Sequence, residues 1–172
     1  MKKPTVLRPH DIAVALQVVL TPRARFVDLA ASLGLSAAEV HNAVRRLQKA
    51  RLLSVSGRSA SVPALQEFAV YGVPYAFPAE LGPESRGVPT SHSAPPLAEW
   101  FGADDAVVWP SEDGEVRGHS LVPLLPSAPR LARTNPSLYR LLTLLDALRI
   151  GQARERTKAK VLLEQALREG PA

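Results

Sequence analysis

The distribution of proline divides this chain of 172 residues into three regions. Eleven of the sixteen prolines lie between Pro63 and Pro129. Proline lacks a backbone N–H and disfavours helix in the residue before it, so this stretch is unsuited to long helices. The flanking segments, residues 8–62 and 135–169, show the apolar spacing of amphipathic helices. We therefore predict a fold that is mainly α with minor β (α+β), organised as residues 8–62, 63–134 and 135–169.

The composition limits the classes of protein to which this chain can belong. Apolar residues make up 46% of the chain, enough for a hydrophobic core. There are no cysteines, which excludes disulfides, thiolate metal sites and cysteine nucleophiles and fits a reducing cytoplasm. No apolar run approaches the roughly 20 residues that span a bilayer, and no apolar segment follows Lys2 and Lys3 as it would in a secretory signal. We expect a cytoplasmic protein without a membrane partner.

The charge is concentrated near the N-terminus. The whole chain has a net charge of +5 and a pI near 10.0. Residues 1–62 hold ten basic and three acidic side chains, a net charge of +7, and the remaining residues carry −2. This excess of positive charge predicts that any polyanionic partner binds the N-terminal third.

Three helices are expected between residues 8 and 50. The first begins near Pro9 and ends at Thr21-Pro22. The second begins near Phe26 and ends at Gly34, which supplies a turn. The third opens with the capping box Ser36-Ala37-Ala38-Glu39. Its buried stripe is Val40, Ala43, Val44 and Leu47.

A small β-hairpin is expected after the third helix. Leu52–Ser56 and Ser59–Val62 alternate apolar residues with serines, and Gly57-Arg58 between them permits a tight reversal.

This order of elements resembles the winged helix-turn-helix of MarR-like bacterial regulators over residues 8–62. The resemblance rests on a small Ala30 where two helices cross, Gly34 in the turn and Val40 beneath it. It implies double-stranded DNA as partner, with the third helix in the major groove and the hairpin on the backbone or minor groove.

The candidate DNA-binding residues fall into two groups. Polar and basic side chains on the outer face of the third helix are placed to meet base edges or phosphates, whereas arginines in the neighbouring turns are placed to hold the backbone. The first group is Ser36, Ala37, His41, Asn42, Arg45, Arg46 and Lys49, and the second is Arg23, Arg25 and Arg58. A solvated basic helix without a nucleic-acid partner is the alternative.

Nothing in the sequence predicts catalysis, a cofactor or a metal. The four histidines, His10, His41, His92 and His119, are not at metal-ligand spacing, and no phosphate-binding or nucleophile motif is present. Acidic residues near Asp113 sit beside glycines, so turn chemistry explains them better than a metal-dependent enzyme does.

The middle region is expected to hold little regular structure. We predict a short helix at residues 64–72, extended chain at 73–78, a long loop at 82–96, a helical turn at 97–101, and strands at 106–109 and 116–125. Trp100 and Trp109 are expected to pack a small second core.

The C-terminal region is expected to form two helices. Asn135 caps the first, Pro136 opens it, and Gly151 separates it from a helix at residues 152–168. Their dense leucines favour a homodimer slightly over a hairpin packed on its own chain. The sequence thus predicts a homodimeric transcriptional repressor. The alternative is an antitoxin-like protein that binds a cognate protein and regulates its own operon.

Overall fold

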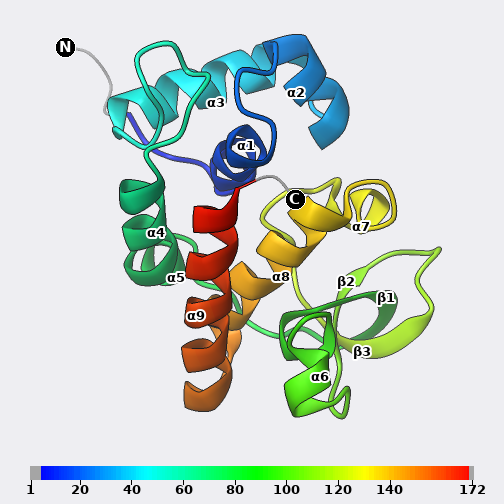
Figure 1. Ribbon diagram of the computed structural model, residues 1–172. Helices are drawn as coiled ribbons and strands as arrows, with labels where there is room; N and C mark the ends of the chain where they lie inside the picture. The colour runs from blue at the N-terminus through cyan, green and yellow to red at the C-terminus, as the bar shows by residue number, and fades with distance from the viewer. Residues whose placement is uncertain (1–4, 171–172) are drawn as a thin grey trace.

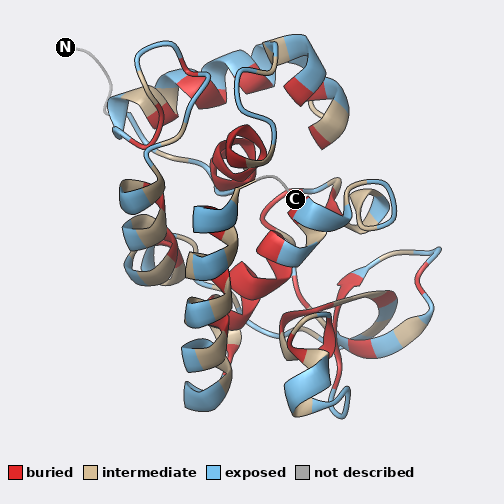
Figure 2. Ribbon diagram, in the orientation of Figure 1, coloured by how far each residue is buried: buried red, intermediate tan, exposed pale blue. Residues whose placement is uncertain are grey.

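Two buried helices form the centre of the molecule, which a computed structural model describes for residues 5–170 (Figure 1). They are α1 (Pro9–Leu20) and α8 (Pro136–Ile150). All residues from Asp11 to Val19 are buried, as are all those from Leu141 to Leu148 (Figure 2). A helix buried on all sides belongs to the core.

Outer helices cover this central pair on two sides (Figure 1). On one side α2 (Phe26–Leu33) and α3 (Ala37–Lys49) pack on α1. On another, α9 (Ala153–Glu169), α4 (Val62–Tyr71) and α5 (Val73–Ala76) pack on α8. The fold is mainly α with minor β, as the sequence predicts.

A three-stranded barrel packs on α8 beside these helices. Strand β1 (Glu84–Thr90) pairs antiparallel with both β2 (Val107–Pro110) and β3 (Val116–Ser120), while β2 and β3 pair in parallel. At Gly87, where β1 passes from one partner to the other, an added Cβ would lie 2.1 Å from the carbonyl oxygen of Trp109. Short helical turns flank the strands, namely η1 (Ser91–Ser93), α6 (Ala98–Phe101) and α7 (Ala128–Leu131).

The local signals at the helix ends are confirmed. Pro9 and Pro136 open α1 and α8, and the Asn135 carboxamide accepts the backbone N–H of Leu138 at 3.2 Å. Gly34 ends α2 with φ of 63°, and a Cβ there would lie 2.6 Å from the guanidinium of Arg130. Glycine is therefore favoured by the left-handed turn, and the α7 segment lies close against it.

Four expectations for the middle of the chain are wrong. Residues 73–76 form α5 because Pro74 lies in its first turn, where the missing N–H costs nothing. Residues 84–90 form β1. Pro89 pairs with Val108 of β2 and lies outside the pairing of β1 with β3, so it sits where a strand tolerates proline. The expected hairpin after α3 reduces to one bridge between Leu53 and Ala60, because Val62 already begins α4. Trp109 is buried, but Trp100 is 62% exposed beneath the ammonium of Lys158.

One hydrophobic cluster runs through all three regions defined from the sequence. Side chains of α1 and α3 join those of α8 and α9, together with Leu97, Trp109 and Leu125 from the proline-rich stretch. The leucines of α8 are buried in this core. The feature that favoured a homodimer is therefore explained by packing within the chain.

A buried carboxylate holds the barrel to the central helix. Asp146 of α8 is 1% exposed and accepts hydrogen bonds from Thr90 Oγ1 and Trp109 Nε1, both at 2.7 Å. Arg149 Nη1 donates to its other oxygen at 2.8 Å, and Arg149 Nε donates to the Phe77 carbonyl at the same distance. Burial raises the pKa of Asp146, while Arg149 and the two neutral donors oppose that rise. Asp146 thus joins β1 and β2 to α8, and Arg149 joins the end of α5 to the same group of contacts.

We predict that Asp146→Ala lowers the free energy of unfolding by about 3–5 kcal/mol, because it leaves the Arg149 guanidinium unpaired in the core. Denaturant unfolding followed by circular dichroism measures the change. Asp113→Ala, at an exposed turn, is the matched control and should stay within about 0.5 kcal/mol of the wild type. Equal stability of the two variants would contradict the assigned role of Asp146.

Candidate nucleic-acid interface

Helix α3 presents one side to the core and the other to solvent. Ser36 Oγ accepts the backbone N–H of Glu39 at 3.2 Å, and Glu39 Oε2 accepts the Ser36 N–H at 2.8 Å, so the predicted capping box is confirmed. The predicted stripe from Val40 to Leu47 is buried against α1 and α2. The exposed members of the candidate set on this helix are Ser36, Ala37, His41, Asn42, Arg45 and Lys49.

Unlike its exposed neighbour Arg45, Arg46 is bound to a side chain of α1. Its Nε and Nη2 atoms donate to the two oxygens of Asp11, each at 2.7 Å, in a bidentate ion pair. The Asp11 side chain is 1% exposed and that of Arg46 is 15% exposed. This pair joins α3 to the first turn of α1. We therefore correct the candidate set: the fork of Arg46 is occupied by Asp11 and is not available for a base.

The pair also shapes the charge of its surroundings. The hydrogen bonds that Arg46 donates to Asp11 raise the pKa of Arg46, which keeps it charged. Burial lowers the pKa of His10, which outweighs the attraction of Asp11. Its Nε2 lies 3.5 Å from Asp11 Oδ1 and has no hydrogen-bond partner within residues 5–170. His10 is therefore held in its neutral form beside the ion pair.

A basic groove lies along the last turns of α3. Its volume is about 360 Å³, and the segment before α1 forms its other wall. Lys49 Nζ donates to Thr5 Oγ1 at 3.0 Å across one end. Arg8, Asn42, Arg45 and Arg46 also line it, so the groove offers cations and an amide to an anion, although Arg46 is already bound to Asp11. No hydrogen bond or ion pair engages the Arg45 side chain in the described part of the chain.

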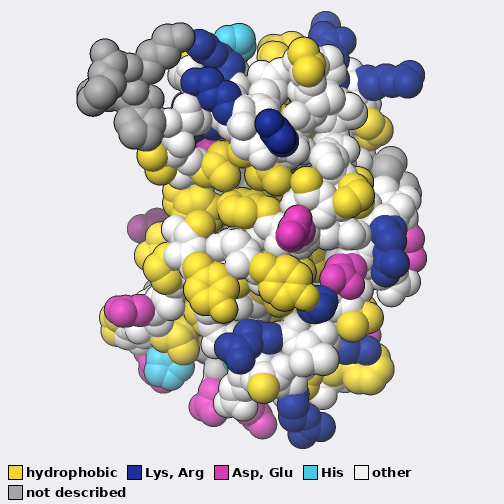
Figure 3. Space-filling view, turned by 90° about the vertical axis from the view of Figure 1, so that its left-hand side faces the viewer, with side chains coloured by type: hydrophobic (Ala, Val, Ile, Leu, Met, Phe, Trp, Pro, Cys, Tyr) yellow, Lys and Arg dark blue, Asp and Glu magenta, His cyan; other side chains and the backbone are white. Residues whose placement is uncertain are grey.

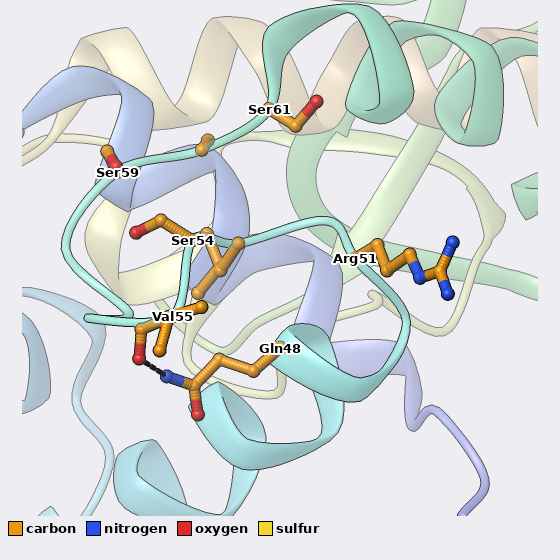
Figure 4. Close-up of a pocket in the computed structure, with 8 residues that line it drawn as sticks. Gln48, Arg51, Ser54, Val55, Ser59 and Ser61 are labelled. Carbon is orange, nitrogen blue, oxygen red and sulfur yellow. Dashed lines mark hydrogen bonds between the residues drawn. The ribbon is translucent and has the colours of Figure 1, made fainter.

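The loop that replaces the expected hairpin is held against α3. Gln48 Nε2 donates to the Val55 carbonyl at 2.6 Å, and Ser54 N donates to the Ser59 carbonyl at 2.9 Å (Figure 4). Between loop and helix lies a hollow of about 540 Å³ that Ser54, Ser59 and Ser61 line (Figure 4). The loop thus stands beside α3 without a β-ladder.

The structure brings together two arginines that are far apart in sequence. Arg23 N donates to the Arg58 carbonyl at 2.9 Å, so the turn after α1 lies against the tip of this loop, and both side chains are exposed. Arg25, also exposed, binds Asp28 through Nε at 2.8 Å. That hydrogen bond raises the pKa of Arg25 and lowers that of Asp28. Arg25 is therefore partly neutralised, whereas no ion pair involves Arg23 or Arg58 within residues 5–170.

These cations gather at one end of the molecule. Figure 3 shows Lys and Arg side chains over the end that carries α3 and its loop, above a largely hydrophobic centre. His41 packs edge-on to Phe26, with ring centroids 6.3 Å apart, which fixes it on the outer face of α3. Glu39 opposes an anion at the start of the helix, because hydrogen bonds from Ser36 lower its pKa and keep it ionised.

Sequence reasoning missed the partner of Arg46 although a signal was present. Asp11 is followed directly by the apolar run Ile12–Leu16, so helical spacing already placed a carboxylate at the end of a buried helix. A buried carboxylate requires a cation or several donors. Asp146, within the leucines of α8, carries the same signal.

Searches against known protein families, curated proteins and solved structures found no match. Among the described residues, no cluster of three or more potential metal ligands occurs. Of the helices in residues 5–170, none has the length and apolar character needed to cross a bilayer.

We predict that substitutions of two adjacent arginines of α3 change the free energy of unfolding by very different amounts. Arg46→Met should lower the free energy of unfolding by about 3 kcal/mol, because Asp11 is left charged and buried without its partner. Arg45→Met should change it by less than about 0.5 kcal/mol, since Arg45 is exposed. Chemical denaturation of both variants measures the difference, and similar stabilities would refute the assigned ion pair.

We predict that His10 makes stability depend on pH. Its pKa in the folded protein lies below the ordinary value of 6.5, so the unfolded chain binds this proton first and stability falls as the pH drops below 6.5. His10→Gln should lose less stability than the wild type between pH 7 and about pH 5. Thermal unfolding across this range measures the two slopes. A steeper loss in the variant would show that protonated His10 instead gains from Asp11.

Proposed function

We propose that this protein binds double-stranded DNA and regulates transcription, with the exposed side of α3 in the major groove. The observation that carries the proposal is the exposure of α3. Its inner stripe is fully packed and Arg46 is bound to Asp11, while Asn42, Arg45 and Lys49 face outward on one side. The major groove of B-DNA admits one α-helix, and a rigid platform sets its angle of entry.

The flanking cations support the same proposal. Arg8 lies with Arg45 and Lys49 along one side of α3, and Arg23 with Arg58 on the neighbouring turns. Phosphate contacts of this kind fix the register of a protein on a duplex, whereas base contacts select sequence. Within the proposal, His41 and Asn42 meet base edges, Arg45 reaches a base or a phosphate, and Lys49 holds a phosphate together with Arg8, Arg23 and Arg58.

The resemblance to winged helix-turn-helix regulators favours this assignment and also implies a homodimer and repression. Such proteins commonly bind paired half-sites as two-fold dimers, so a homodimeric repressor in the cytoplasm remains our prediction. With the α8 leucines inside the core, a dimer requires a different surface. Sedimentation of the protein with and without duplex measures whether one forms.

We predict that Arg45→Ala weakens binding to a duplex selected from a random pool by about 1–3 kcal/mol if it contacts a base. If it contacts a phosphate, the slope of log affinity against log salt falls by about 0.9. Fluorescence anisotropy at several salt concentrations measures both. Arg117→Ala, an exposed arginine on β3 of the barrel, is the matched control. Equal affinities and slopes for the two variants would exclude α3 as the binding helix.

A further inference from the structure

The most exposed aromatic side chains of α4 and α5 share one face with basic residues of α9. Tyr71 is 61% and Tyr75 83% exposed. Lys160 Nζ donates to the Tyr71 hydroxyl at 2.8 Å and lies 5.2 Å from the ring centroid. Figure 3 shows hydrophobic side chains at the centre of this side of the molecule, with Lys and Arg side chains below them. We call the surface of Tyr71, Tyr75, Arg156 and Lys160 the α4–α5–α9 face.

A groove crosses this face. Its volume is about 450 Å³; Val70, Pro74 and Leu148 give it apolar walls, and Tyr75, Arg156 and Lys160 complete it. The guanidinium of Arg149 also borders the groove, although two of its donors are bound to Asp146 and the Phe77 carbonyl. A groove with both apolar and polar walls, bordered by cations, is complementary to a chain that carries both apolar and acidic side chains.

The first half of α9 is strongly basic. Arg154, Arg156, Lys158 and Lys160 all lie there, and Arg154 lies in the first turn, where the helix dipole is positive. Glu155 is the one acid among them, and its Oε2 accepts the Gln152 N–H in a capping box. Glu164 lies one helical turn after Lys160 and offsets part of its charge. Such an arrangement is unfavourable in the free protein, so an anionic partner would stabilise it.

A second copy of the chain fits this face poorly, an argument that rests on the proposed function. The C-terminal end of α9 lies nearer α3 than its N-terminal end does (Figure 1). Two copies reading one duplex need a two-fold axis that keeps both α3 helices on the same side, and this sets the basic halves of α9 against each other. The antiparallel alternative places the two α3 helices at opposite ends.

We propose that the α4–α5–α9 face binds an acidic segment of a partner protein, with an apolar side chain of that segment in the groove and its carboxylates on Arg156 and Lys160. This site is separate from the outer side of α3. One protein could therefore occupy it while DNA is bound, as the antitoxin-like alternative requires.

The test uses the full chain and a capped six-residue peptide with leucine and phenylalanine at its centre and two acidic residues on either side. Titration followed in ¹H–¹⁵N spectra should give saturable shifts confined to α4, α5 and the first half of α9. The double variant Arg156→Gln/Lys160→Gln should weaken the peptide by about tenfold. Arg154→Gln, on the same helix but outside the groove, is the matched control and should leave the affinity unchanged.

Three results would overturn the proposal. One is an affinity that the double variant does not change, or shifts that fall on α3 instead. A second is equal binding of the same peptide with its acids replaced by amides. A third is a shift of the groove residues with protein concentration alone, which would assign the face to a second copy. Tighter binding of oligothymidine than of the peptide would likewise assign it to single-stranded nucleic acid.

Discussion

The ion pair between Asp11 and Arg46 determines which side of α3 faces solvent. A carboxylate that is 1% exposed costs several kcal/mol unless a cation meets it, and here the cation comes from the helix proposed to read DNA. Each residue turns a helix by about 100°, so shifting α3 by a single position would separate the two groups. The buried stripe alone would tolerate small rotations, whereas the bidentate pair does not. Arg45 and Asn42 are therefore held in one orientation by a contact that their own helix makes with α1.

The sequence predicted the parts of the fold that local rules govern. The capping box at Ser36, the left-handed Gly34 and the start of α8 after Asn135 each depend on residues a few positions apart, and each is confirmed. Strand β1 was missed because Pro89 argues locally against a strand, and only the long-range register shows that the site tolerates it. For the candidate site, six of the seven residues predicted for the outer face of α3 are exposed, and Arg46 is bound to Asp11 instead. The adjacency of Arg23 and Arg58 depends on a backbone contact across 35 positions, which no local pattern encodes.

Helix α8 changes the meaning of the leucine pattern at the C-terminus. Read alone, closely spaced leucines are as compatible with an interface as with a core. In the folded chain they lie beneath α1, α9 and the barrel, and Asp146 among them fixes Thr90, Trp109 and Arg149. The polar contact specifies how the barrel sits, and the leucines supply the buried area. The two surfaces that we propose for partners are the outer side of α3 and the α4–α5–α9 face.

The shared core of α1 and α8 also limits how the molecule can be divided. In many regulators a DNA-reading unit can be cut out and grafted elsewhere, because a linker separates it from the rest. Here one flank of α1 is covered by α8, from more than a hundred positions later in the chain. A fragment ending at residue 62 would leave that flank bare to water. Residues 8–62 therefore share a buried surface with α8. A change in the packing of α8 would alter the support of α1, on which α3 packs.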